Sequence, residues 1–193
     1  MTELWLIRHG QTDWNVAGRW QGQSAHAPGL NDLGYSQAMA IFEQVKGKRI
    51  SAIYSSDLLR ARQTAELIGQ PLGLTVNLEP RLREINLGDW EGMLSVNIAA
   101  KYPHELAQRV LDPFHTCAPN GESPQDVAGR VLMAVNEIAN RHRNESIVIV
   151  GHGVSLAVII CHAQGFPMDD VYQHIPDNAQ PYHIHWTNRD TFK

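Results

Sequence analysis

Two short apolar runs in this chain each end close to a histidine. Residues 4–7 lead into Arg8 and His9, and residues 147–150 lead into Gly151 and His152. A continuous run of about four apolar residues is typical of a strand that is buried on both faces. We therefore expect both histidines at the carboxyl ends of buried strands.

Segments with helical spacing of apolar residues alternate with strand-like segments along the chain. We expect strands at 4–7, 50–54, 74–78, 147–150 and 182–186, and helices at 32–47, 58–68, 124–142 and 154–163. This alternation predicts an α/β fold, a three-layer sandwich in which a mostly parallel central sheet carries helices on both faces. Sheets of this kind bind ligands beyond the carboxyl ends of their strands, where the two histidines fall.

The length of the chain fits one domain. We expect a single domain over residues 1–193, because domains have about 100 to 200 residues. Residues 94–121 are the least regular part, and we expect them to form a small irregular cap over the pocket. Nothing in the sequence indicates a repeat or a linker.

Charge and cysteine content exclude several classes of partner. The chain has 16 Lys and Arg against 20 Asp and Glu, without a long run of one sign, so we expect no nucleic-acid partner. Cys117 and Cys161 are far apart, which predicts neither a disulfide framework nor a zinc knuckle. The first apolar stretch is too short for a signal-peptide core or a membrane span, so we expect a cytoplasmic protein without a membrane partner. A homodimer is left open.

The segment after the first strand has the chemistry of a phosphate site. His9 offers an imidazole, whose reference pKa of about 6.5 leaves much of it unprotonated and nucleophilic at neutral pH. Arg8 and Arg60 offer planar guanidinium groups, which suit the equatorial oxygens of a transferred phosphoryl group. The helix that begins after His152 offers backbone N–H donors at its N-terminus.

Four motifs in order extend this interpretation: Arg8-His9-Gly10, the segment 55–61, Glu84 before the segment 88–92, and Gly151-His152-Gly153. Together they resemble the histidine phosphatase superfamily, the phosphoglycerate mutase-like proteins, over nearly the whole chain. The resemblance implies that His9 is the phosphorylated nucleophile. It further implies a phosphate clamp of Arg8, Arg60 and His152, a proton donor in Glu84 rather than Glu91, and further phosphate or substrate contacts from Thr12, Asn15, Gln21, Gly22 and Gly153.

The resemblance implies a phosphomonoester hydrolase of the phosphatase branch that acts on small phosphorylated metabolites and releases inorganic phosphate. The loop at residues 18–22 resembles that of α-ribazole phosphatases and broad-specificity relatives, and the substrate stays open. One alternative is a phosphoglycerate mutase, although residues 92–121 offer only Lys101 and Arg109 for a second anionic group. Another is a phospholigand-binding module without turnover.

We expect neither a metal nor another cofactor, because side chains supply the nucleophile and the phosphate clamp. His183 and His185 alternate along a possible strand and share a face. Two imidazoles without a nearby cysteine or carboxylate make a weak metal site, so we expect none there. Trp20, Trp90, Met93 and Tyr102 are candidates to line the pocket.

Overall fold

A computed structural model of the chain describes residues 1–187, and a five-stranded sheet lies at its centre. The strand order is β3-β2-β4-β1-β5. Neighbouring strands are parallel except β5, which runs antiparallel to β1. The strands are β1 (Thr2–Arg8), β2 (Ile50–Ser55), β3 (Val76–Leu78), β4 (Ser146–Gly151) and β5 (Pro181–Trp186). The predicted strands and the mostly parallel sheet are confirmed.

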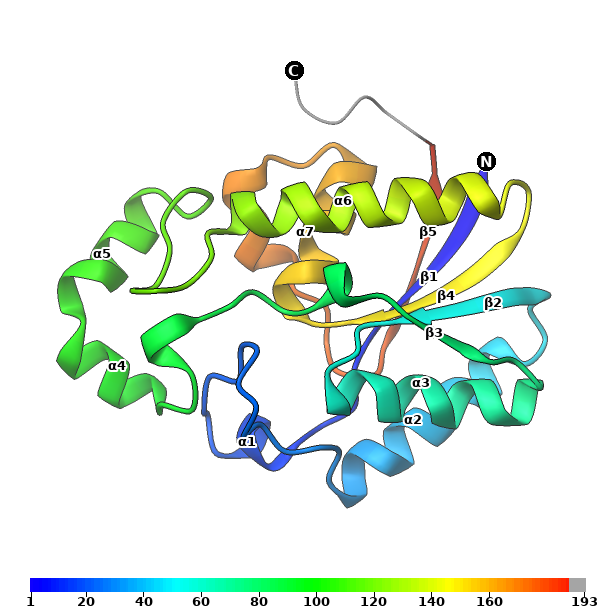
Figure 1. Cartoon of the computed structure of the whole chain (residues 1–193), viewed down its shortest axis with the longest axis horizontal. Helices are drawn as coiled ribbons and strands as arrows, with labels where there is room; N and C mark the ends of the chain where they lie inside the picture. Colours follow the sequence, from blue (N-terminus) through cyan, green and yellow to red (C-terminus); the bar gives the residue numbers. More distant parts are fainter. Residues whose placement is uncertain (188–193) are drawn as a thin grey trace.

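Helices cover both faces of the sheet, as Figure 1 shows, and the predicted three-layer α/β fold is confirmed. Helices α2 (Asp32–Val45) and α3 (Leu59–Leu72) lie on one face, and α6 (Pro124–Arg141) and α7 (Gly153–Gln164) lie on the other. A hydrophobic core lies on each face of the sheet, and side chains of β1 contribute to both. Leu4 and Leu6 pack on the α6–α7 side, and Ile7 packs on the α2–α3 side.

Local sequence signals explain where the helices begin and end. The Asn31 side chain accepts a hydrogen bond from the Gly34 N–H at the start of α2, and Ser123 forms a capping box with Asp126 at the start of α6. Helix α3 continues through Pro71 to Leu72, and its C-cap is Gly73, whose φ of 70° is left-handed.

The segment at 94–121, expected to be irregular, is partly helical. It contains α4 (Ser95–Lys101) and α5 (Pro103–Leu111). Both helices are short, and Pro103 begins the second at a position where proline is favoured. The pair lies beside the sheet layers, close to α1 (Asp13–Val16), as Figure 1 shows.

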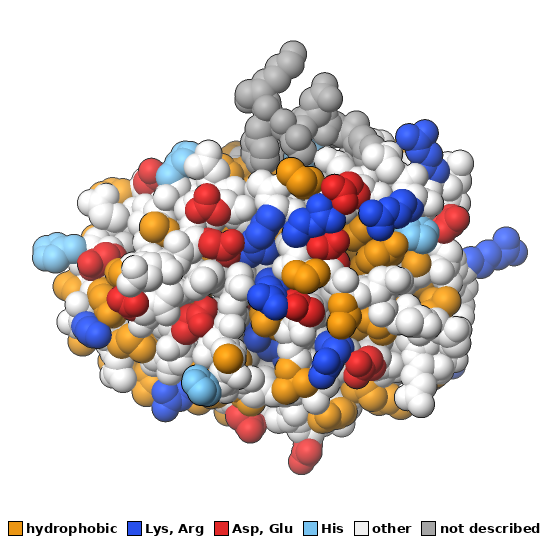
Figure 2. Space-filling model, in the orientation of Figure 1, with side chains coloured by type: hydrophobic (Ala, Val, Ile, Leu, Met, Phe, Trp, Pro, Cys, Tyr) orange, Lys and Arg blue, Asp and Glu red, His pale blue; other side chains and the backbone are white. Residues whose placement is uncertain are grey.

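Three short 3₁₀ helices complete the described elements: η1 (Pro80–Leu82), η2 (Gly88–Trp90) and η3 (Met168–His174). On the face seen in Figure 2, basic and acidic side chains are interspersed. The ion pairs of the described chain include Arg130 with Glu122 at 2.8 Å and Arg83 with Asp57. Within residues 1–187, no helix combines the length and the apolar character needed to cross a membrane.

Candidate active site

His9 follows β1 at the carboxyl end of the sheet, and its ring is held in one neutral tautomer. Nδ1 lies 2.8 Å from the carbonyl oxygen of Gly10, which can only accept, so Nδ1 carries the proton. Arg60 Nε donates to Nε2 of His9 at 3.1 Å, which leaves the lone pair on Nε2. The ring is 2% exposed. Nε2 is therefore the unprotonated ring nitrogen, and its lone pair faces Arg60.

Two arginines place positive charge beside this nitrogen. Arg60 comes from the first turn of α3, is 2% exposed, and also donates from its Nη2 to the carbonyl of Gly22 at 2.9 Å. Burial lowers the pKa of Arg60 to about 10, so it stays cationic at neutral pH. Arg8 donates to the carbonyl of Pro176 at 3.0 Å, and its buried Nε has no hydrogen-bond partner within the described chain.

His152 lies behind His9, with 5.2 Å between the ring centroids. It follows β4 as the N-cap residue of α7 and is fully buried, and neither ring nitrogen has a hydrogen-bond partner among residues 1–187. Because an unpartnered buried nitrogen is costly, these atoms suit a ligand that carries oxygen. Burial, together with the charges of Arg60 and Arg8, holds the pKa of both His9 and His152 well below the usual value.

Glu84 occupies the N-terminus of α7. Its carboxylate accepts hydrogen bonds from the backbone N–H of Ile85 at 2.9 Å, of Val154 at 3.0 Å and of Ser155 at 3.3 Å. The helix donors that the sequence suggested for phosphate are thus occupied by Glu84, and that expectation is corrected. A Cβ at Gly153 would lie 3.2 Å from Glu84 Oε2, so the glycine gives this carboxylate room.

His9, both arginines and Glu84 line one cavity of about 290 Å³, a size that suits a small ligand. Seven predicted site residues line it: Arg8, His9, Asn15, Gln21, Gly22, Arg60 and Glu84. Thr12, Gly153 and His152 are not among the lining residues. Glu91, the rival carboxylate, instead accepts from the backbone N–H of Gln23 at 2.6 Å and of Leu87 at 3.2 Å.

Thr12 and Gly10 support the histidine loop from outside the cavity. Thr12 is fully buried and caps α1, and its hydroxyl lies 3.1 Å from the side-chain oxygens of both Asn15 and Gln21. A Cβ at Gly10 would lie 2.5 Å from the carbonyl oxygen of Gly34 in α2. Gly10 thus allows a helix, rather than a ligand, to approach the backbone.

The structure adds two cations to the cavity lining, Arg19 and Arg109. Arg109 reaches in from cap helix α5, and its guanidinium lies 4.1 Å from the ring centroid of Tyr172 and 4.8 Å from that of Trp20. No carboxylate of the described chain pairs with it. Arg109 was noted in the sequence as one of two basic residues of the cap. Its position in the cavity was not predicted, because α5 was not recognised.

Four further residues missed by the sequence reasoning line the cavity with apolar atoms: Ile85, Leu87, Val154 and Ile175. Of the aromatic candidates, Trp20 lines the cavity, whereas Trp90 is fully buried in the core. Met93 and Tyr102 are partly buried and pack against the same core. Apolar wall residues carry no motif, so only the fold identifies them.

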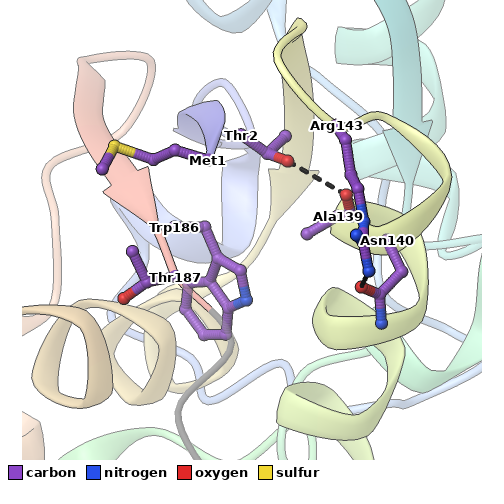
Figure 3. Close-up of a pocket in the computed structure, with 7 residues that line it drawn as sticks. All are labelled: Met1, Thr2, Ala139, Asn140, Arg143, Trp186 and Thr187. Atoms are coloured by element: carbon purple, nitrogen blue, oxygen red, sulfur yellow. Dashed lines mark hydrogen bonds between the residues drawn. The ribbon is translucent and has the colours of Figure 1, made fainter.

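A larger cavity, of about 390 Å³, lies at the opposite end of the sheet (Figure 3). There Thr2 Oγ1 donates to the carbonyl of Ala139 at 3.0 Å, and Arg143 donates to Asn140 Oδ1 at 3.2 Å. The described residues that line it include neither an imidazole nor a carboxylate. Its lining thus lacks the imidazole and the carboxylate that line the smaller cavity.

The histidine pair in β5 has a carboxylate neighbour, contrary to the sequence expectation. Glu3 of β1 lies opposite His185 in the sheet register, and potential ligand atoms of Glu3, His183 and His185 lie within 4.8 Å of one another. The remaining histidines are His26, His104, His115, His142, His162 and His174, and none of them lines the cavity with His9.

Comparison with known proteins identifies the class. The family model of the histidine phosphatase superfamily, branch 1, matches residues 4–192. The chain belongs to this superfamily, and the resemblance of its motifs is confirmed.

Relatives in this family have different activities. Phosphoserine phosphatase 1 of Hydrogenobacter thermophilus is 33% identical over 98% of this chain and 89% of its own length. A probable phosphoglycerate mutase of Erwinia tasmaniensis is 35% identical over 86% of this chain and 77% of its own. The solved structure of a mycobacterial glucosyl-3-phosphoglycerate phosphatase with VO3 is 35% identical, has a TM-score of 0.84, and is matched over 94% of this chain and 91% of that chain.

Proposed function

We propose that this protein hydrolyses small phosphomonoesters through a phosphohistidine on His9. The observation that carries the proposal is the arrangement at Nε2, an unprotonated nitrogen that faces the buried guanidinium of Arg60 at 3.1 Å. Arg8 lines the same cavity, so two cations flank the position that a phosphoryl group would take. Such preorganised charge stabilises the equatorial oxygens as the phosphoryl group transfers.

The reaction has two displacements at phosphorus. In the first, Nε2 of His9 forms the P–N bond while the ester P–O bond breaks, and Glu84 donates a proton to the leaving oxygen. In the second, Glu84 accepts a proton from water, the water oxygen forms the new P–O bond, and the P–N bond breaks to release inorganic phosphate. Before the first step, Arg60 exchanges its hydrogen bond to Nε2 for one to the phosphoryl oxygens.

The test is covalent labelling. Incubation with a ³²P-labelled phosphomonoester and rapid quenching in base should trap one acid-labile, base-stable phosphate per chain. His9→Ala should lose both the label and turnover. His104→Ala, at an exposed histidine of the cap, should keep both. Tight binding of the ester without label or turnover would instead establish a binding module.

The same labelled enzyme separates hydrolysis from mutase activity. A mutase returns the phosphoryl group to the glycerate, whereas a phosphatase passes it to water. Lys101, one of the two cap cations, is exposed, lies 5.0 Å over the Tyr102 ring and does not line the cavity. We therefore expect 3-phosphoglycerate to yield inorganic phosphate. Interconversion of 2- and 3-phosphoglycerate at a rate above hydrolysis would overturn the assignment.

We further propose that the preferred esters carry a second anionic group. Four guanidinium groups line the cavity, against the single carboxylate of Glu84. Arg8 and Arg60 serve the phosphate, which leaves Arg19 and Arg109 in excess. The aromatic rings around Arg109 hold its guanidinium without neutralising it. Phosphoserine and phosphoglycerate, named in the relatives above, each carry a carboxylate near the phosphate.

Paired substrates test this preference. Phosphoserine and phosphoethanolamine differ by one carboxylate, and kcat/KM should be higher for phosphoserine. Arg109→Gln should lower kcat/KM for phosphoserine by about ten- to a hundredfold, the range for losing a charge-assisted hydrogen bond. It should leave phosphoethanolamine unchanged. Lys101→Gln is the matched control, and an equal loss on both substrates in Arg109→Gln would contradict the role.

A further inference from the structure

A cluster of possible metal ligands lies where the last described strand joins the first. Strand β5 pairs with β1 at the edge of the sheet, with Glu3 opposite His185 and Trp5 opposite His183. Alternation along a strand places these four side chains on one face. Trp5 belongs to the core side of α2 and α3, whereas both histidines are exposed.

The three polar side chains converge. Nε2 of His183 lies 4.0 Å from the Glu3 carboxylate, and the two imidazole rings are 5.0 Å apart between centroids. The His183 ring also packs against Trp5, with 4.5 Å between ring centroids. The hydroxyl of Ser146 donates a hydrogen bond to the Glu3 carboxylate and so helps to orient it.

We propose that Glu3, His183 and His185 bind a divalent transition-metal ion of the Zn²⁺ class. Two imidazole nitrogens and one carboxylate oxygen form a ligand set that such ions accept. Their ligand atoms lie within 4.8 Å of one another, and tetrahedral coordination with bonds of about 2.1 Å brings ligands to roughly 3.4 Å. Small rotations of exposed side chains close that difference.

The surroundings favour a site completed by water. Glu3 and His185 line a surface cavity of about 490 Å³, which leaves space for a water ligand. Two nearby side chains carry positive charge and would repel the ion. Lys48 lies 5.2 Å over the Trp5 ring, and Arg49 lines the cavity. The Ser146 hydrogen bond to Glu3 supplies the outer-shell support that metal ligands commonly have.

The site is separate from catalysis. Glu3 and His9 are six residues apart along one extended segment, which corresponds to roughly 20 Å. A metal at the β1–β5 junction would bridge two strands that come from opposite ends of the chain. Its effect is therefore to fasten the edge strand to the sheet, and hydrolysis by His9 proceeds without it.

The experiment uses the full chain with any purification tag removed, at pH 7.5. Zn²⁺ is titrated in competition with a chromophoric chelator, and Cu²⁺ is followed by electron paramagnetic resonance. We expect one equivalent of Zn²⁺ and a Cu²⁺ spectrum with two nitrogen ligands. His183→Ala and His185→Ala should each weaken Zn²⁺ binding by at least about tenfold, as should Glu3→Gln. His9→Ala should bind as the parent does.

Three further variants make the result specific. His104→Ala removes an exposed histidine outside the cluster and should leave affinity unchanged. Lys48→Gln removes a repelling charge and should tighten binding by a few-fold. Cu²⁺ should also quench the fluorescence of Trp5, an effect that Trp5→Phe removes. Zn²⁺ binding that is equal in the parent, His183→Ala and His185→Ala would overturn the proposal, as would the absence of a bound equivalent.

Discussion

Glu84 has two roles in the proposed mechanism. It accepts hydrogen bonds at the start of α7, and it donates a proton to the leaving oxygen. As the acceptor for the first N–H groups of α7, its carboxylate is held at the helix N-terminus. As the proton donor to a leaving oxygen it must be protonated when the ester is bound.

Glu84→Gln separates these tasks, because an amide oxygen still accepts from α7 but the side chain no longer donates a proton as an acid. With an alkyl phosphate such as phosphoserine, kcat should fall by about 10²- to 10⁴-fold. With p-nitrophenyl phosphate, whose phenolate leaves without protonation, the fall should be much smaller. Steady-state kinetics on both esters measures the difference.

Glu91→Gln is the control for this residue, since Glu91 lies outside the cavity and bonds to loop backbone. It should leave the ratio of the two rates unchanged. A loss in Glu84→Gln that is equal for the alkyl and the aryl ester would remove Glu84 from the role of acid.

At the scale of elements, helix α2 is packed directly against the histidine loop. A Cβ at Gly34 would lie 2.1 Å from the carbonyl oxygen of Gln11, two residues after His9. Only backbone fits between the helix and the loop at this point. The contact explains why glycine occurs on both sides, at Gly10 and at Gly34.

Gly34→Ala should therefore lower both the free energy of unfolding and kcat, because the methyl group pushes the His9 loop away from Arg60. Gly129→Ala in α6 is the matched control, since a Cβ there meets nothing within 4 Å. It should raise the free energy of unfolding by about 0.5–1 kcal/mol and leave kcat unchanged. Urea titration and p-nitrophenyl phosphate hydrolysis measure the two quantities. Equal stability and equal kcat in Gly34→Ala and the parent would contradict the packing argument.

Elements with strong local signals were predictable and those without were not. The apolar runs gave β1 and β4, and Asn31 and Ser123 marked the starts of α2 and α6. Helices α4 and α5 are too short for a clear period. Contacts between distant segments were not predicted either, because no sequence spacing indicates that Glu3 lies near His185 or Arg109 near Trp20.

The candidate catalytic residues were more predictable than their surroundings. His9, Arg8, Arg60 and Glu84 belong to motifs at the ends of regular elements, and the parallel sheet brings these ends together. The occupation of the α7 N-terminus by Glu84 was not predictable, because a helix terminus accepts either a ligand or a side chain.

For the whole molecule, two buried neutral histidines make stability depend on pH. The pKa of His9 and of His152 lies well below the value of about 6.5 expected in the unfolded chain. Above pH 6.5 neither state binds these protons. As pH falls below 6.5 the unfolded chain binds them first, so the folded state loses stability until pH reaches the folded pKa values.

The free energy of unfolding should fall by about 1.4 kcal/mol per histidine for each pH unit within that window. Urea titrations between pH 7.5 and pH 5.5 measure it. The dependence should be roughly halved in His152→Gln and unchanged in His104→Ala, which alters only an exposed ring. A parent protein equally stable at both pH values would show that the two rings are not held neutral by the fold.

Arg109 and the phosphate clamp come from separate stretches of the chain. The residues of the proposed clamp follow β1 and β4 or lie in the first turn of α3, whereas Arg109 comes from α5, which has no buried residue of its own. Exchanging α4 and α5 for the corresponding helices of another family member should consequently change the substrate preference. Phosphoryl transfer to His9 should be retained. Substrate range can diverge in this architecture without touching the nucleophile.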